Sequence, residues 1–118
     1  MSARAAPDAA ALERVRRVLE RDYMRRLPLA ALARVAACSP FQLLRAFRRR
    51  HGVTPHVYQE QLRLEAAGAL LANHARTITA IALELGYAHH SHFTAAFRRR
   101  FGVTPRAFRR RQTTGASR

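Results

Sequence analysis

The sequence predicts an all-α fold of about seven helices, arranged as two similar groups that a long helix joins. Apolar residues recur at the i, i+3, i+4, i+7 spacing of a buried helix face, and no segment alternates with the two-residue period of a strand. Residues 47–55, FRRRHGVTP, also recur as residues 97–105, FRRRFGVTP, with eight of nine positions identical at an offset of 50. A match of this length indicates an internal duplication.

The first subdomain is expected to hold three helices, of which the first precedes the repeated copy. Apolar spacing defines the first two, through Leu12, Val15, Leu19 and Tyr23 and then through Leu29, Leu32, Ala33 and Ala36. Pro28 separates them. A third helix runs from Pro40 to about His51, because Ser39 is a good N-cap, proline suits the first helical position and Gly52 is a plausible left-handed stop.

A long helix then leads into the second copy. Thr54 and Pro55 repeat the cap-plus-proline signal, and the helix continues to about Leu71. The second copy has a short helix with Ile78, Ile81, Ala82 and Leu85 on one face, a turn after Gly86, a helix at 90–101 and a last helix from Pro105 to about Arg111. Its short helix matches the first copy at an offset of 49, so the turn of the second copy holds one extra residue.

These signals divide the chain into five segments. We expect a flexible N-terminus at 1–11, a first subdomain at 12–54, a linker helix at 55–72, a second subdomain at 73–111 and a disordered tail at 112–118. No apolar run approaches the roughly 18 residues of a membrane span, and no signal peptide is recognisable, so a cytoplasmic, nucleoid-associated protein is expected.

Charge indicates the partner. The chain has 22 basic residues, all of them Arg, against 7 acidic ones, and residues 23–59 and 85–118 contain no acid at all. Basic charge segregated in this way favours a polyanion, although a merely solubilising surface or an Arg-rich genome gives the same composition.

A short helix, a tight turn and a second helix with a basic open face form the helix-turn-helix plan. With Leu43 and Phe47, and likewise Phe93 and Phe97, turned inward, the opposite faces would enter the major groove of double-stranded DNA. The expected base-reading residues are Phe41, Gln42, Leu44 and Arg45 in the first copy and His90, Ser91, Thr94 and Ala95 in the second. The expected phosphate-binding residues are Arg48, Arg49, Thr54, Arg98, Arg99 and Thr104.

The motifs resemble the DNA-binding domain of the AraC/XylS family of bacterial transcription regulators. The resemblance covers about residues 12–110 and is strongest over IALELGY at 81–87, Ser91-His92-Phe93 and FRRRFGVTP at 97–105. It implies an activator that works beside RNA polymerase, in a small stand-alone member or in a fragment of a larger regulator. The family's base-contact positions fall on Phe41, Leu44, Arg45, His90, Ser91, Thr94 and Ala95, although many members place an Arg where this chain has Ala95.

Other functions fit the sequence less well. No catalytic Ser/His/Asp set, carboxylate pair or Gly-rich phosphate loop is present, so we expect no enzyme and no cofactor. His89, His90 and His92 diverge around a helix start with no acid or Cys nearby, so we expect no metal site. The alternative is a nonspecific architectural nucleic-acid-binding protein. The oligomeric state stays open, and a monomer is compatible with the duplicated plan.

Overall fold

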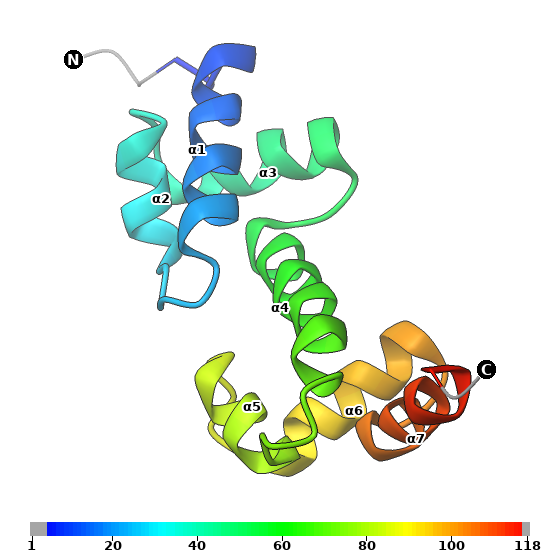
Figure 1. The fold of residues 1–118 in the computed structure, drawn as a ribbon. Coiled ribbons are helices and arrows are strands. Elements are labelled where there is room, and N and C mark those ends of the chain that lie inside the picture. Colours follow the sequence, from blue (N-terminus) through cyan, green and yellow to red (C-terminus); the bar gives the residue numbers. More distant parts are fainter. Residues whose placement is uncertain (1–4, 117–118) are drawn as a thin grey trace. The chain divides into compact units, whose positions relative to one another are not determined.

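The computed structural model of the chain describes residues 5–116, which form seven α-helices and no strand, as the sequence predicts. The chain divides into two compact units, with the boundary between Leu62 and Arg63, and Figure 1 labels the helices in chain order. The helices are α1 (Ala9–Asp22), α2 (Leu29–Val35), α3 (Pro40–His51), α4 (Pro55–Leu71), α5 (Ile78–Glu84), α6 (His90–Phe101) and α7 (Pro105–Ala116).

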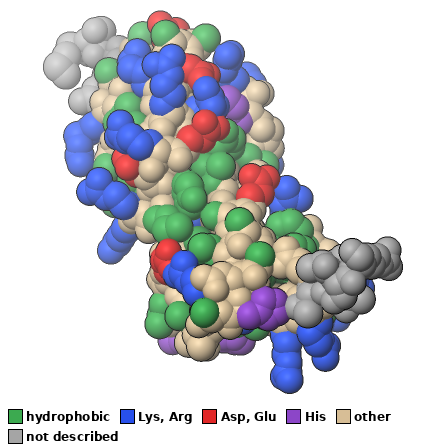
Figure 2. Space-filling view, in the orientation of Figure 1, with side chains coloured by type: hydrophobic (Ala, Val, Ile, Leu, Met, Phe, Trp, Pro, Cys, Tyr) green, Lys and Arg blue, Asp and Glu red, His purple; other side chains and the backbone are tan. Residues whose placement is uncertain are grey.

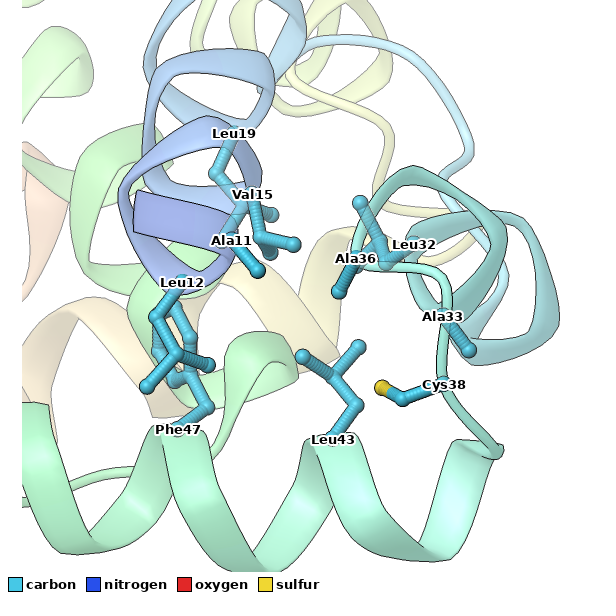
Figure 3. Close-up of a cluster of buried hydrophobic side chains, with 10 residues drawn as sticks. All are labelled: Ala11, Leu12, Val15, Leu19, Leu32, Ala33, Ala36, Cys38, Leu43 and Phe47. Carbon is cyan, nitrogen blue, oxygen red and sulfur yellow. The ribbon is translucent and has the colours of Figure 1, made fainter. Parts of the chain in front are cut away.

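The core of the first unit lies between α1, α2 and α3. Figure 3 shows side chains of α1 and α2 pointing toward Leu43 and Phe47, which α3 contributes and which have no exposed surface. Val15 and Leu19 of α1 are also fully buried. Burying an aliphatic or Phe side chain contributes about 1.5–3 kcal/mol, so these residues hold α3 with one face inward.

The second unit repeats this core with the second half of α4 in the place of α1. Leu64, Ala67 and Leu71 are buried at the same i, i+3, i+7 spacing as Leu12, Val15 and Leu19. They pack with α5 and with Phe93 and Phe97 of α6. The expected scheme of two subdomains flanking a separate linker helix at 55–72 therefore differs from the observed one, in which α4 supplies core residues to the second unit.

Each unit anchors the loop after its first helix in the same way. The side-chain amide of Gln59 donates to the carbonyls of Tyr23 and Arg25, at 3.0 and 2.7 Å. Arg109, 50 positions later, donates to the carbonyls of Leu71, Asn73 and Arg76 at 2.9, 3.2 and 2.7 Å. The duplication thus extends to the long-range bonds that close each unit, which the sequence comparison did not reveal.

The turns between the paired helices show where the second copy holds its extra residue. Ala37 and Gly86 are equivalent, since both have positive φ values, +54° and +94°. The following amides, of Cys38 and Tyr87, donate to Ala33 and Ala82 in matching bonds of 3.1 and 3.0 Å. The N-caps Ser39 and His89 come next in register at an offset of 50, so the inserted residue is Ala88.

Both predicted ends of the chain need correction. Residues 1–11 were expected to be flexible, but α1 begins at Ala9 because the Asp8 carboxylate accepts the Ala11 amide at 2.8 Å as an N-cap. The disordered tail was expected from Gln112, but α7 continues to Ala116. The half-buried Gln112 side chain donates to the Gly68 carbonyl at 3.5 Å, which ties this part of α7 to α4. Residues 1–4 and 117–118 lie outside the described residues.

The Gly86 turn gives a stability prediction. Gly86→Ala should lower the free energy of unfolding by about 1–3 kcal/mol, because an L-residue at this φ is strained. The Cβ of an alanine at position 86 would also lie 2.9 Å from Cζ of Arg63. Ala37→Gly at the equivalent turn is the matched control. It should change stability by less than about 1 kcal/mol, because relief of strain offsets the added backbone entropy. Urea unfolding of both variants measures these changes. Equal losses of unfolding free energy in the two variants would contradict the claim that the positive φ requires glycine at position 86.

Candidate nucleic-acid interface

The start of α3 is fixed by a capping box. The Ser39 hydroxyl accepts the Gln42 amide N–H at 3.1 Å, and Oε1 of Gln42 accepts the Ser39 N–H at 3.0 Å. Both bonds satisfy donors that the helix itself leaves open. Gln42 was expected to read bases, but its side-chain oxygen already serves the cap. In a two-bond contact with adenine the same oxygen would have to accept a second hydrogen bond, so the two roles compete for it.

The open face of α3 carries an aromatic–cation pair. Phe41 is 65% exposed, and Cζ of Arg45 lies 5.4 Å from the centroid of its ring. The Arg45 side chain is exposed and Leu44 is half-buried beside it. A guanidinium at this distance is attracted to the ring face by about 0.5–1 kcal/mol at an exposed site. Phe41 therefore restricts where the Arg45 donors can point.

One neighbour of this face was not predicted from the sequence. Ala6, which precedes α1, lines a small hollow together with Phe41, Gln42, Arg45, Ala46 and Arg49. Ala6 thus lies beside the open face of α3. No periodicity or cap signal in the sequence indicates this contact, because it joins parts of the chain that are far apart.

The equivalent face of α6 brings together all four residues predicted for it. His90, Ser91 and Ala95 are exposed and Thr94 is half-buried, and they line one open hollow of about 730 Å³ with Arg98 and Arg99. Nδ1 of His90 and Oγ1 of Thr94 are 3.4 Å apart. The N-cap of α6 differs from that of α3, because the His89 side chain makes no capping hydrogen bond. The two faces therefore share position and polarity but not chemistry.

The arginine triplets are divided between solvent and protein. Arg48, Arg49, Arg98 and Arg99 are exposed, and Arg side chains project from the surface in Figure 2. Arg100 is exposed too, but it forms an ion pair with Glu65 at 3.3 Å and lies 5.4 Å from the centroid of the Phe101 ring. Three consecutive helical residues spread around the axis, so one member of the second triplet turns back to its own unit.

Thr54 and Thr104 cap the helices that follow α3 and α6. Their hydroxyl oxygens accept the amides of Val57 and Ala107 at 3.3 and 3.1 Å. Both threonines are half-buried at helix N-termini, where backbone N–H groups and the helix dipole favour anions. Their placement is compatible with the expected phosphate contacts.

Among the residues that the structure describes, no three His, Cys, Asp or Glu side chains are grouped so that they could hold a metal ion. Within the same range, no helix is long and apolar enough to cross a membrane.

The paired helices, tight turns and outward faces define a helix-turn-helix domain in two copies. A protein-family model described as a helix-turn-helix domain matches residues 32–111. The chain belongs to the AraC/XylS family of helix-turn-helix transcription regulators, as its relatives and structural neighbours agree.

The relatives are bacterial transcription regulators. XylDLEGF operon transcriptional activator 2 of Pseudomonas putida is 36% identical over 84 residues, which cover 69% of this chain and 54% of that protein. The HTH-type regulator YbfI of Bacillus subtilis is 35% identical over 74 residues, which cover 63% of this chain and 26% of YbfI. The chain thus spans about half of the first relative and a quarter of the second. AdaA of Bacillus subtilis, named a bifunctional transcriptional activator and DNA repair enzyme, is 29% identical over 87 residues, 74% of this chain and 41% of AdaA.

Solved structures have the same fold. A probable AraC family regulator from Rhodopseudomonas palustris CGA009 matches with a TM-score of 0.81 and 28% identity, covering 87% of this chain and 97% of the other. The DNA-binding domain of AdpA, solved in complex with a target DNA, matches with a TM-score of 0.76 and 24% identity, covering 84% and 89% of the two chains. At that identity the AdpA match shows the fold alone.

The capping box gives a prediction for Gln42. Gln42→Glu should preserve the stability of the first unit to within about 0.5 kcal/mol, because a Ser–Glu pair closes the same box, whereas Gln42→Ala should cost about 0.5–1.5 kcal/mol. Thermal unfolding of both variants measures the difference. If Gln42→Ala were as stable as the parent chain, the hydrogen bond to Ser39 would have no energetic role.

Proposed function

We propose that this chain binds double-stranded DNA sequence-specifically by inserting α3 and α6 into successive major grooves. One observation carries this proposal: two equivalent helices each bury an apolar face with a fully buried phenylalanine, expose a polar, arginine-bearing face, and are followed by a helix that a threonine caps. The exposed groups can donate to guanine, accept from cytosine or adenine, and touch thymine methyls. The net charge of +15 favours the polyanion that carries these bases.

We further propose that the bound chain activates transcription by acting beside RNA polymerase. Two relatives from Pseudomonas putida are named XylDLEGF operon transcriptional activators, and residues 32–111 of this chain match a helix-turn-helix family model. In vitro transcription from a promoter that carries the footprinted site would test the activator role. Repression, or no effect on transcript yield, would contradict it.

Footprinting tests the DNA-binding proposal. Each unit presents one of the two helices, α3 or α6, and successive major grooves on one face of DNA lie about one helical turn apart. One chain should therefore protect two major-groove segments about 10 bp apart on one DNA face. Protection of a single segment, or an obligatory stoichiometry of two chains per site, would contradict it. Equal affinity for scrambled duplexes would support an architectural role instead.

Arg45 is expected to read a base. Arg45→Ala should weaken binding to the specific site by about 1–3 kcal/mol and relax the preference at one or two base pairs. Phe41→Ala should relax the same preference more weakly, because it removes the ring beside the Arg45 guanidinium. Arg14→Ala, an exposed arginine of α1, is the charge-matched control and should leave base preference unchanged. Selection from a randomised duplex pool measures the preference. An equal loss on all sequences for Arg45→Ala would make it a phosphate contact.

Salt should weaken binding steeply. If each chain neutralises on the order of 6–10 phosphates, log affinity should fall against log salt with a slope of about −5 to −9. Replacing Arg48 or Arg98 with Ala should flatten that slope by about one and weaken specific and random DNA alike. Arg100→Ala is the matched control, because Arg100 is paired with Glu65, and it should leave the slope nearly unchanged. A slope near zero in the parent chain would show that the charge excess does not act on DNA.

A further inference from the structure

The single difference within the nine-residue repeat lies at the edge of the first unit's core, where the half-buried His51 packs against Phe47. His51 stands where the second unit has Phe101, and the two rings have nearly the same surroundings. The His51 and Phe47 rings are 4.4 Å apart at 42°, and the Phe101 and Phe97 rings are 4.5 Å apart at 41°. An imidazole therefore fills a site that is built for a phenyl ring.

A third ring that packs with these two is also more polar in the first unit than in the second. Tyr58 stands where the second unit has Phe108, and it packs edge-on against Phe47 at 5.6 Å and His51 at 5.8 Å. Its hydroxyl donates to the Glu20 carboxylate at 2.7 Å. The cluster of Phe47, His51 and Tyr58 thus joins α3 to α4 and, through Glu20, to α1. The second unit makes the α6–α7 contact with three phenyl rings.

The surroundings of the imidazole disfavour its protonated form. Its Nε2 atom is buried and has no hydrogen-bond partner. Charged and titratable groups face it from every packed element: Glu13, Arg16 and Glu20 on α1, Arg50 on α3 and Tyr58 on α4. Burial lowers the pKa of His51 below its ordinary value of 6.5, the Arg50 and Arg16 charges lower it further, and Glu13 and Glu20 oppose this only in part. A proton on Nε2 would have no acceptor, and unpartnered buried donors are costly.

We propose that His51 makes the first unit acid-sensitive and leaves the second unit unaffected, so that mild acid loosens the α3–α4 contact and releases the DNA segment held by the first unit before that held by the second. The loosening follows from the ring cluster and its orphan nitrogen. Only the release from DNA rests on the proposed function.

The pH window follows from the direction of the shift. In the unfolded chain His51 takes up a proton near pH 6.5, whereas in the folded unit its pKa is lower. The stability that neutral His51 contributes is therefore complete above pH 6.5. It is lost as the pH falls toward the pKa of His51 in the folded unit. Each pH unit between the two pKa values raises the unfolding constant of the first unit about tenfold. The Glu13 and Glu20 carboxylates, whose pKa values Arg16 and Tyr58 hold below 4.5, act only in more acidic solution.

Amide hydrogen exchange on the full chain tests the loosening without DNA. Protection factors, corrected for intrinsic exchange, are compared between α3 and α6 at pH 7.5 and 5.5. In the parent chain α3 should lose protection severalfold more than α6. His51→Phe should remove this difference, and the reciprocal Phe101→His should transfer the loss to α6. Equal loss in both units of the parent chain, or the same pH response in His51→Phe, would overturn the proposal.

Two further measurements separate the possible failures. NMR titration of the His51 ring in the parent chain should give a midpoint below 6.5, and a midpoint at or above that value would overturn the proposal even if Phe101→His failed to fold. Footprinting at pH 5.5 should then show one of the two protected segments fading first, with recovery in His51→Phe. If α3 loses protection from exchange but both DNA segments lose protection together, the first unit is acid-sensitive as proposed. In that case the assignment of one unit to each DNA segment is wrong.

Discussion

The inward packing of Leu43 and Phe47 on α3, and of Phe93 and Phe97 on α6, determines what each unit can present. All four side chains are fully buried. Because residues four apart lie on one side of a helix, burying them fixes the rotation of the helix about its axis and leaves the opposite side in solvent. Phe41 and Arg45, or Ser91 and Ala95, are exposed for this reason and not through any contact of their own. Without the buried pair, the helix would keep its polar side chains, but its rotation about its axis would not be fixed, so these side chains would point in no defined direction.

Both units bury their helix in this way, but most residues on the exposed sides of α3 and α6 differ. The α3 helix has a capping box and an arginine beside an exposed ring, whereas α6 has an uncapped start, several histidines and an alanine at the position of Arg45. In the aromatic cluster of the core, the polar rings of His51 and Tyr58 replace the phenyl rings of Phe101 and Phe108. A duplicated scaffold can therefore carry two unlike reading surfaces, since packing and recognition use opposite sides of the same helix.

Local signals predicted the interior helices well. The bounds of α3, α4 and α6 agree with those expected, because Ser39, Pro40, Gly52, Pro55 and Gly102 act on their own neighbours. The ends of the chain were mispredicted, since the Asp8 cap was overlooked and the link from Gln112 to Gly68 is long-range. The roles of Gln59 and Arg109 were not predicted either, because both side chains donate to carbonyls at least 33 residues away. Among the candidate site residues, the exposure of Phe41 and the α6 face followed from helix periodicity, whereas the capping role of Gln42 competes with its expected one.

The central claim is that one chain holds DNA through both units at once. The most direct measurement is the affinity of the purified chain for a duplex in which about 5 bp, half a helical turn, are inserted between the two protected segments. Insertion moves one segment to the opposite DNA face, so affinity should fall at least about tenfold, a loss of roughly 1.4 kcal/mol, toward that of a duplex with a single segment. Unchanged affinity after the insertion would contradict the claim, because it would mean that one unit alone accounts for binding.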